Sequence, residues 1–437
     1  MLAVTTAVSS AQPPAPAPLT RLPNIVIIFA DDLGYGDLGV YGHPLIKTPR
    51  LDRLASEGLK LTSFYASAPV CSASRYSLLT GRYAIRAGIN GALMPESQTG
   101  LGAGETTIAD ILKSAGYRTG MVGKWHLGNR PGFFPTEHGF DSYFGLLYSN
   151  DMVRPWVQTD VALRLFRGTQ EVPGEVDNAT LTERYTEEAV AFIREHKGRP
   201  FFLYLAHSMP HVPLGVSPRF AGRSANGRYG DVIETIDWST GQVLDALRDA
   251  GVERDTLVVF TSDNGPWMDM PARMLVEPRI VRTDAGSAGP LRGSKGTTWE
   301  GGTRVPFLAR WPGHIRAGAV SSDLATTMDI LPTVAGIVGV PLPQGRTIDG
   351  QDIRPFLEGV APSPVEWYVY NYGGRVEGVR DRRWKLHLTF PEKSEPVAAL
   401  YDLLVDPSER WDVAAEHPEI VARLSERLRQ FAGEVAR

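Results

Sequence analysis

Long apolar runs that stop abruptly at polar residues recur along the chain. Three of them have the near-continuous apolar character of strands buried on both faces of a sheet: residues 24–30 (NIVIIFA), 201–206 (FFLYLA) and 257–261 (LVVFT). They stop at Asp31, His207 and Ser262, each at the head of a polar or turn-forming stretch. Open α/β sheets bind ligands beyond the carboxyl ends of their strands, so these stopping points are the first places to seek a site.

Amphipathic helical patterns separate these apolar runs. One helix is expected around residues 108–112, and two more over residues 185–196 and 232–247, because apolar residues recur there on one helical face. Strands that alternate with helices predict an α/β fold with a largely parallel sheet.

The pattern changes after about residue 362. Three short strand-like stretches follow, at residues 367–372 (WYVYNY), 378–388 (GVRDRRWKLHL) and 399–407 (ALYDLLVDP). They predict a small antiparallel sheet, and an apolar stripe over residues 418–437 predicts a closing helix. We therefore expect a large α/β domain over residues 23–361 and a C-terminal subdomain of sheet and helix over residues 362–437.

The first 22 residues have a different character. MLAVTTAVSSAQ resembles the end of a secretory signal, and QPPAPAP continues it as a stiff, extended linker. We expect residues 1–22 to be a signal remnant or a disordered Pro-rich tail. The first reading places the protein in the periplasm or outside the cell, and the second leaves a cytoplasmic location open.

Composition excludes several functions. The formal net charge of −4 argues against a nucleic-acid surface. No stretch is long and apolar enough to span a bilayer. Cys71 is the only cysteine among 437 residues, which excludes an internal disulfide framework and a multi-cysteine metal site.

Oxygen ligands gather at two of the predicted strand ends. Asp31 and Asp32 follow the first strand, and Asp263 and Asn264 follow the strand over residues 257–261. Three carboxylates and a carboxamide form a hard-oxygen set suited to Ca²⁺ or Mg²⁺. Taken alone, the Asp31-Asp32 pair is equally well read as a solvated turn.

Cations and histidines lie in glycine- and proline-rich segments. Lys124 and His126 occur in GMVGKWHLG, His211 follows His207 in AHSMPHVP, and Lys295 lies in LRGSKGTTWEGG. With Arg75, the two lysines form a set that suits an anion. A solvated lysine and a core histidine are the plainer interpretations. The chain has no GxSxG elbow and no P-loop, so metal-assisted chemistry on an anionic ester is favoured.

The chain resembles the type I sulfatases of the alkaline-phosphatase-like superfamily, and is especially similar to arylsulfatase A-like members. Eight segments occur in the order found in that family: NIVIIFADDLGYGDLG, CSASRYSLLTGRY, GYRTGMVGKWHLG, PTEHGFDSYFGLLYSND, AHSMPHVP, VVFTSDNGP, GSKGTTWEGGTRVP and ALYDLLVDPSE. The resemblance covers residue 24 to the C-terminus. It implies a large, mostly parallel mixed sheet flanked by helices, with a smaller α+β domain.

The resemblance gives the lone cysteine a role. In the family, the cysteine of a C-x-P-x-R motif is oxidised to the aldehyde formylglycine by a maturation enzyme. Here the motif reads Cys71-Ser72-Ala73-Ser74-Arg75, with alanine in place of proline. The oxygen-dependent converting enzyme favours proline, whereas radical-based converters accept alanine, so the departure leaves the converting partner open.

The resemblance also implies roles by matching position. The metal, Ca²⁺ or else Mg²⁺, would be held by Asp31, Asp32, Asp263, Asn264 and the modified Cys71. Sulfate would be contacted by Lys124, Ser149, His211 and Lys295. Arg75 would stabilise the formylglycine, His126 would deprotonate its hydroxyl, and His211 would protonate the leaving alcohol. His207 matches no catalytic position and is expected to be structural.

The implied function is therefore hydrolysis of sulfate monoesters through S–O cleavage by a formylglycine hydrate. Two alternatives stay open on the sequence. One is a phosphomonoesterase or phosphonate monoester hydrolase of the same superfamily, and the other is a sulfated-glycan binder in which Cys71 stays a thiol. The substrate, whether an aryl, sugar, steroid or lipid sulfate, is not indicated.

Overall fold

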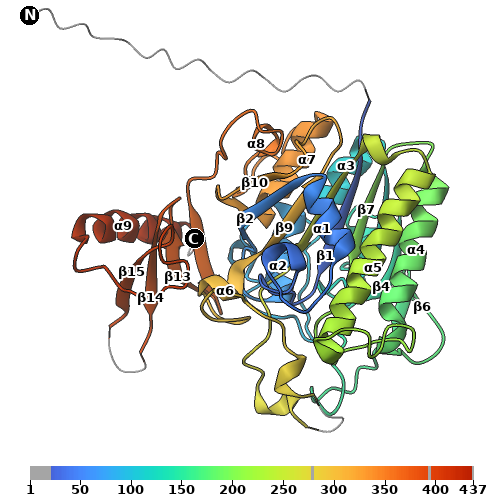
Figure 1. Cartoon of the computed structure of the whole chain (residues 1–437), viewed down its shortest axis with the longest axis horizontal. Coiled ribbons are helices and arrows are strands. Elements are labelled where there is room, and N and C mark those ends of the chain that lie inside the picture. The colour runs from blue at the N-terminus through green and yellow to red at the C-terminus, as the bar shows by residue number, and fades with distance from the viewer. Residues whose placement is uncertain (1–20, 277–279, 392–394, 436–437) are drawn as a thin grey trace, which may run out of the picture.

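The computed structural model describes residues 21–276, 280–391 and 395–435 (Figure 1). The N-terminal segment expected to be a signal remnant or tail lies outside the described residues except for Arg21 and Leu22. The described chain forms a large α/β body and a smaller sheet with one helix beside it (Figure 1).

The large sheet has eleven strands and is mixed but mostly parallel. Its order is β10-β2-β9-β8-β1-β7-β3-β4-β5-β6, and β11 also pairs with β2. The strands are β1 (Asn24–Ala30), β2 (Leu59–Tyr65), β3 (Arg118–Gly123), β4 (Ser142–Leu146), β5 (Leu165–Arg167), β6 (Gln170–Glu171), β7 (Phe201–Ala206), β8 (Thr256–Ser262), β9 (Arg304–Arg310), β10 (Ala319–Ser321) and β11 (Ala325–Thr326). β1 lies between β7 and β8 and is parallel to both. The antiparallel pairings are those of β9 with β2 and β8, and those of β5 with β4 and β6.

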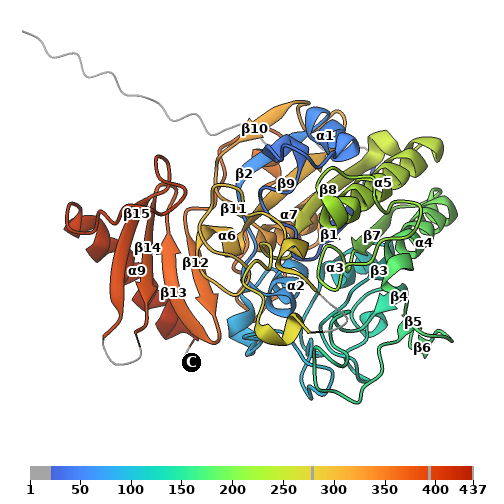
Figure 2. The same ribbon diagram turned by 60° about the horizontal axis from the view of Figure 1, so that its bottom comes forward.

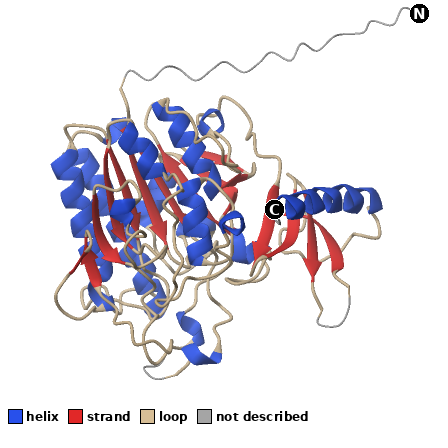
Figure 3. Ribbon diagram, turned by 180° about the vertical axis from the view of Figure 1, so that it is seen from behind, coloured by secondary structure: helices blue, strands red, loops and turns tan. Residues whose placement is uncertain are grey.

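Helices cover both faces of this sheet (Figures 1 and 3). They are α1 (Pro49–Ser56), α2 (Cys71–Thr80), α3 (Ile108–Ser114), α4 (Leu181–His196), α5 (Gly227–Asp249), α6 (Glu300–Thr303), α7 (Ile330–Val338) and α8 (Arg354–Leu357). Short 3₁₀ helices in the connections are Gly39–Tyr41, Ala84–Ala87, Pro135–Glu137, Asn178–Thr180, Glu253–Asp255, Ala272–Met274, Arg282–Asp284 and Thr327–Asp329.

β1 shows why its sequence is apolar throughout. Ile25, Ile27 and Phe29 face the core formed with α2, α3 and α7, whereas Val26 and Ile28 face the core formed with α1, α4 and α5. Both sets are removed from water, so a polar side chain on either face of the strand would lose its hydration. The prediction of a doubly covered, largely parallel sheet is confirmed.

The smaller sheet is antiparallel, in the order β12-β13-β14-β15. Its strands are β12 (Tyr368–Tyr372), β13 (Arg375–Arg380), β14 (Trp384–Thr389) and β15 (Val397–Asp402), and α9 (Pro418–Val435) packs across one face (Figure 2). The expected boundary between residues 361 and 362 stays a prediction; the large sheet ends at β11 and the small one begins at β12.

One strand-like stretch expected from the sequence is in fact two strands. Residues 378–388 contain the end of β13, a turn and most of β14. The turn forms because Oδ1 of Asp381 accepts hydrogen bonds from the backbone N–H groups of Arg383 at 2.7 Å and Trp384 at 2.6 Å. An aspartate that bonds the backbone two residues on is a turn signal, and it ends β13 here.

Candidate active site

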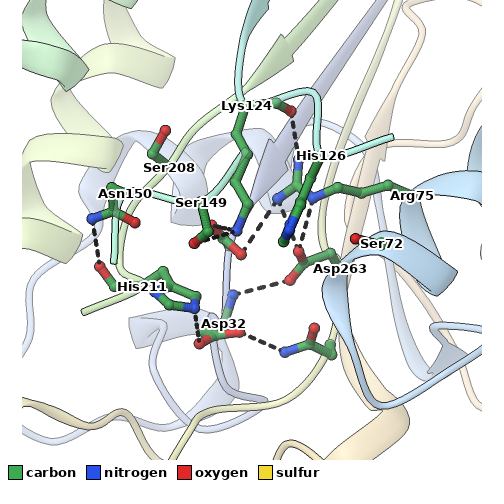
Figure 4. Close-up of polar contacts among 12 residues, drawn as sticks. Asp32, Ser72, Arg75, Lys124, His126, Ser149, Asn150, Ser208, His211 and Asp263 are labelled. Atoms are coloured by element: carbon green, nitrogen blue, oxygen red, sulfur yellow. Dashed lines mark hydrogen bonds and ion pairs between the residues drawn. The ribbon is translucent and has the colours of Figure 1, made fainter. Parts of the chain in front are cut away.

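The carboxyl ends of neighbouring parallel strands bring the polar segments together. β8, β1, β7, β3 and β4 are consecutive in the sheet, and Ala30 pairs with Ser262, so the residues that follow β1 and β8 emerge side by side. Figure 4 shows the side chains that gather there, from segments far apart in the sequence. This is the edge at which an open α/β sheet binds its ligand.

Three carboxylates form the floor of the site. Asp31, Asp32 and Asp263 are at most 3% exposed, and each offers an oxygen within 4.8 Å of the others. Asp32 has φ 63°, in the left-handed region that a non-glycine residue adopts at a cost, and its backbone N–H donates to Oδ1 of Asp263 at 3.0 Å. The local strain therefore directs two adjacent aspartates toward one point.

Asn264 completes this set of oxygens. Its amide nitrogen donates to Oδ1 of Asp32 at 2.7 Å and to the carbonyl of Gly265 at 2.9 Å. Its Oδ1 is buried and has no hydrogen-bond partner, and the same is true of Oδ1 of Asp31. Buried oxygens that accept no hydrogen bond, within a cluster of three carboxylates, fit a hard divalent cation, which would satisfy them.

Three buried cations surround the carboxylates. Nζ of Lys124 lies 2.5 Å from Oδ2 of Asp31, and Nζ of Lys295 lies 2.8 Å from Oδ1 of Asp32. Arg75 is 2.8 Å from Oδ2 of Asp263 and 3.4 Å from Oδ1 of Asp31. The cations and carboxylates balance formally, so a divalent cation would give the site an excess of positive charge.

The pKa values reflect this crowding. Burial works against ionisation of Asp31, but Lys124 and Arg75 outweigh it and hold the pKa of Asp31 well below its usual range. Burial, with the charge of Asp31 beside it, raises the pKa of Asp263 to about 7. Burial also opposes the charge of Lys295, yet the Asp32 carboxylate raises the Lys295 pKa above its usual range. Further positive charge beside Asp263 would therefore favour its ionised form.

The segment after β3 is shaped by close backbone packing. Gly123 has φ 111°, and a Cβ there would lie 1.7 Å from the carbonyl oxygen of Ala206, so only glycine fits. The N–H of Lys124 donates to that same carbonyl at 2.7 Å. This packing turns the Lys124 side chain inward, where Nζ also reaches Oγ of Ser149 at 3.1 Å.

His126 has a defined tautomer. It adopts φ 60°, and its Nε2 lies 3.0 Å from the carbonyl oxygen of Leu93. A carbonyl only accepts, so Nε2 of the neutral ring carries the proton and Nδ1, buried and unpartnered, has the free lone pair. Burial and the charges of Lys124 and Arg75 hold the pKa of His126 well below its usual range.

The two histidines after β7 lie in different surroundings. Nε2 of His211 is 3.6 Å from Oδ2 of Asp32, while its Nδ1 is 2.5 Å from the carbonyl of Val212. His207 instead contacts Oγ of Ser239, on α5, at 3.4 Å. Burial lowers the pKa of both, with Lys295 adding to the effect at His211, and takes that of His207 to about 3. His207 therefore lies in the helix-covered core, and the structural role expected for it stays a prediction.

Cys71 is the first residue of α2, one helical turn before Arg75. It is 1% exposed, and burial raises the pKa of its thiol, which the charges of Lys124 and Lys295 partly offset. The structure therefore places Cys71, Arg75, Lys124, His126, His211 and Lys295 at one strand edge with the four oxygen-ligand residues.

Two residues beside the site were missed by sequence reasoning. The ring centroid of Trp267 lies 5.3 Å from that of His211, and Nζ of Lys295 lies 4.5 Å from the centre of the same indole. Asn150 donates to the carbonyl of Pro213 at 3.2 Å. It also donates to the carbonyl of His211 at 3.5 Å (Figure 4). Trp267 immediately follows the segment VVFTSDNGP, and Asn150 lies inside the segment PTEHGFDSYFGLLYSND next to Ser149; these positions were the only signal for them.

The family model for sulfatases matches residues 23–340, and the model of the N-sulphoglucosamine sulphohydrolase C-terminal region matches residues 294–434. The chain belongs to the sulfatase family. This sulfatase is accordingly a sulfuric ester hydrolase, and its family is known to use a metal and formylglycine.

Named relatives agree with this assignment. The sulfatase is 38% identical to arylsulfatase A of Homo sapiens, over 93% of this chain and 87% of that protein. It is 41% identical to N-acetylgalactosamine-6-sulfatase of Rattus norvegicus, over 84% of this chain and 71% of that protein. Steryl-sulfatase of Mus musculus is 38% identical, over 82% and 69% of the two chains.

Solved structures show the same architecture. PsFucS1 sulfatase from Pseudoalteromonas sp. superposes with a TM-score of 0.83 at 29% identity, covering 94% of this chain and 90% of that one. Phosphonate monoester hydrolase of Agrobacterium radiobacter has a TM-score of 0.65 at 20% identity, covering 94% of this chain and 96% of that one, which shows a shared fold alone.

In the described part of the sulfatase, no helix has both the length and the apolar character needed to cross a bilayer.

Proposed function

We propose that the sulfatase cleaves the S–O bond of sulfate monoesters of ring-bearing alcohols, with formylglycine made from Cys71 as nucleophile. The observation that carries this proposal is the buried set of three cations interleaved with three carboxylates at the start of α2. An anionic ester drawn into such a site meets preorganised charge without water between them.

We assign the metal to Asp31, Asp32, Asp263 and Asn264, with residue 71 beside them. All four donors are oxygens, so Ca²⁺ is the preferred ion and Mg²⁺ the alternative. When bound, the cation would lower the pKa of the attacking hydroxyl and withdraw charge from a sulfate oxygen. Formylglycine would supply a hydrated aldehyde, in which one hydroxyl attacks sulfur and the other allows sulfate to be expelled.

The remaining charged groups bind and orient the ester. Lys124 and Lys295 are held by Asp31 and Asp32, so their ammonium groups are fixed before substrate arrives. Ser149 is fixed in turn by its hydrogen bond from Lys124. Together they hold the sulfate in line for displacement and neutralise the charge that grows on its oxygens.

The two histidines divide the proton transfers. Nδ1 of His126 has the free lone pair, so it is the base that deprotonates the second hydroxyl and regenerates the aldehyde. His211 donates to a carbonyl through Nδ1–H, so only its imidazolium form, favoured by Oδ2 of Asp32 at 3.6 Å, would carry a second proton on Nε2 and give it to the leaving oxygen. The backbone carbonyls of Leu93 and Val212 thus decide which ring nitrogen of each histidine faces the reaction.

The leaving group is expected to carry a ring. Trp267 is half-buried and lies against both His211, the proposed acid, and Lys295. An indole at that position offers a flat face to an aryl ring or to the apolar face of a sugar. N-acetylgalactosamine-6-sulfatase and steryl-sulfatase, both relatives of this chain, are named for ring-bearing substrates.

A maturation enzyme is the partner that this proposal requires. It would oxidise Cys71 before α2 is buried, because the thiol is 1% exposed in the folded chain. We propose a periplasmic or secreted location, on the small-residue pattern at the start of the chain.

The test compares the sulfate, phosphate and phosphonate esters of one phenol. The proposal expects the sulfate ester to have the highest kcat/KM, since a single metal with three cations suits a monoanionic ester. A preference for the phosphate or phosphonate ester would favour the alternative activities of the same fold. If Cys71 stays a thiol in a host that has a converting enzyme, and the protein binds sulfated sugars without turnover, the glycan-binding role is favoured instead.

A further inference from the structure

The loop that carries Lys295 lies between two other parts of the active site. The backbone N–H of Lys295 donates to the carbonyl of Pro266, just after the acidic end of β8, at 2.9 Å. The next N–H, of Gly296, donates to the carbonyl of Pro69, just before α2, at 2.8 Å. A shift of this loop therefore moves the Lys295 ammonium relative to both the metal ligands and residue 71.

The C-terminal sheet contacts the other side of this loop through Lys385. The Lys385 side chain, on β14, is 0% exposed. Its Nζ donates to the carbonyl of Thr298 at 2.9 Å and lies 2.6 Å from Oε1 of Glu409 and 3.4 Å from Oε1 of Glu300. The same ammonium is 3.8 Å from the ring centre of Tyr370. One lysine thus joins the loop to the C-terminal subdomain.

Glu409 holds the loop at two further points. Its Oε2 accepts the backbone N–H of Glu300, the first residue of α6, at 2.9 Å. Its backbone carbonyl accepts from Nη1 of Arg292 at 3.0 Å, and the residue itself is in the left-handed region at φ 53°. A non-glycine residue stays in that conformation only where its surroundings determine it, as they do here.

An aromatic contact also joins the loop to the C-terminal sheet. His387, two residues along β14 and on the same face as Lys385, stacks on Trp299 with ring centroids 3.8 Å apart. Its Nε2 lies 2.9 Å from Oγ1 of Thr298. Three residues after the Lys295 turn are therefore each contacted by side chains of the C-terminal subdomain: Thr298, Trp299 and Glu300.

A polar network is a costly way to attach one subdomain to another. Glu300 and Glu409 are buried, with Lys385 between them, and apolar side chains of similar volume would attach the sheet without desolvating charges. Unlike apolar contacts, charged hydrogen bonds are directional and specify one register. We propose that Lys385 and Glu409 are positioning residues for the reaction, which set the location of Lys295 through the loop over residues 292–302. This inference rests on the proposed role of Lys295 in binding sulfate.

The direct test is Lys385→Met, which keeps the apolar stem and removes the ammonium. We expect kcat/KM for an aryl sulfate to fall by about 10- to 100-fold, the effect of a modest displacement of a catalytic group. Because this change leaves Glu409 as a buried carboxylate without its cation, Lys385→Met/Glu409→Gln is the second variant. The glutamine keeps an acceptor for the Glu300 N–H, so this protein should fold and retain the same kinetic defect.

A double-mutant cycle separates positioning from stability. If Lys385 acts through Lys295, then Lys295→Ala costs far less in the Lys385→Met background than in the parent protein. Equal costs in both backgrounds would overturn the inference. Leu386→Ala is the matched control, since Leu386 is buried in the apolar core on the opposite face of the same strand. It should lower the melting temperature while Lys295→Ala keeps its full cost.

Hydrogen exchange provides a readout that does not depend on turnover. In Lys385→Met and in the double variant, the amides of Lys295 and Gly296 should exchange faster. Their hydrogen-bond acceptors, the carbonyls of Pro266 and Pro69, lie outside the loop, so a shift of the loop weakens both bonds. In Leu386→Ala they should be unchanged. Unchanged exchange in the Lys385 variants would overturn the inference even if activity fell. Absence of sulfatase turnover in the parent protein would instead overturn the proposed function, and exchange would still decide the loop question.

Discussion

Two nitrogens of the Arg75 guanidinium, Nε and Nη2, donate to the same oxygen of Asp263, at 3.1 Å and 2.8 Å. The third nitrogen, Nη1, donates to the backbone carbonyl of Lys124 at 2.9 Å. One side chain therefore fixes a proposed metal ligand and the segment that carries a proposed sulfate ligand. It leaves Oδ1 of Asp263 free to accept the N–H of Asp32.

Arg75→Lys tests this arrangement of three guanidinium hydrogen bonds. Lysine keeps the charge but cannot donate in three fixed directions, so we expect kcat/KM to fall on the order of 100-fold. Arg86→Lys is the control, because Arg86 holds Asp349 by a similar fork away from the strand-end site. Steady-state kinetics on both variants decides the point. Equal, small losses would mean that charge alone matters at residue 75.

Asn264→Ala tests the metal site. The variant removes the unpartnered Oδ1 and the hydrogen bond to Asp32, so we expect metal affinity to fall at least about 10-fold. Metal content after dialysis, measured by elemental mass spectrometry, is read beside turnover. Asn24→Ala, at the opposite end of β1, should retain the metal. Full activity in a metal-free preparation of the parent protein would contradict the assignment.

Ala73→Pro tests the maturation of Cys71. Ala73 lies in the first turn of α2, where proline disrupts no helical hydrogen bond, so the fold should tolerate it. In a host with only the oxygen-dependent converting enzyme, we expect a larger fraction of residue 71 as aldehyde or hydrate than in the parent chain. Peptide mass spectrometry gives that fraction. Active protein that carries only the unmodified thiol would refute formylglycine as the nucleophile.

The sequence predicts the central strands well because they are buried on both faces. β1 and β7 have the predicted bounds, and β8 extends one residue beyond the prediction at each end. What local pattern cannot give is the order of strands in the sheet. Asp31 and Asp263 lie together because β1 and β8 pair over a separation of more than two hundred residues. The positions of these residues at predicted strand ends suggested a shared site, and the pairing of β1 with β8 brings them together.

The contacts between the C-terminal sheet and the Lys295 loop could not be predicted from the sequence for a different reason. In the stretch WKLHL, Lys385 and His387 alternate with apolar residues, which predicts a strand with one face in water. Both are buried instead, because Thr298, Trp299 and Glu300 cover that face. A lysine whose partners lie in another part of the chain looks like any surface lysine in the sequence.

His211→Ala tests the proposed acid. Its loss should slow substrates with high-pKa leaving groups by about 100-fold or more, and nitrophenyl-type esters much less, because a good leaving group needs no proton. His207→Ala, in the helix-covered core, should act through thermal stability with no dependence on leaving group. The measurement is kcat/KM across a series of aryl sulfates. A flat response for His211→Ala would remove its acid role.

The oxygen that sulfate carries away tests the mechanism as a whole. If a hydroxyl of the residue 71 hydrate attacks sulfur, the S–O bond breaks and the alcohol keeps its own oxygen. Deprotonation of the second hydroxyl by His126 then expels sulfate with an oxygen that came from water through the hydrate. Turnover in heavy-oxygen water should therefore label sulfate and leave the alcohol unlabelled, cycle after cycle, because the aldehyde rehydrates each time. Mass spectrometry of both products reads the result directly. Label in the alcohol would mean that the C–O bond breaks, and the roles proposed for Cys71, His126 and His211 would all be wrong, even for a protein that releases sulfate.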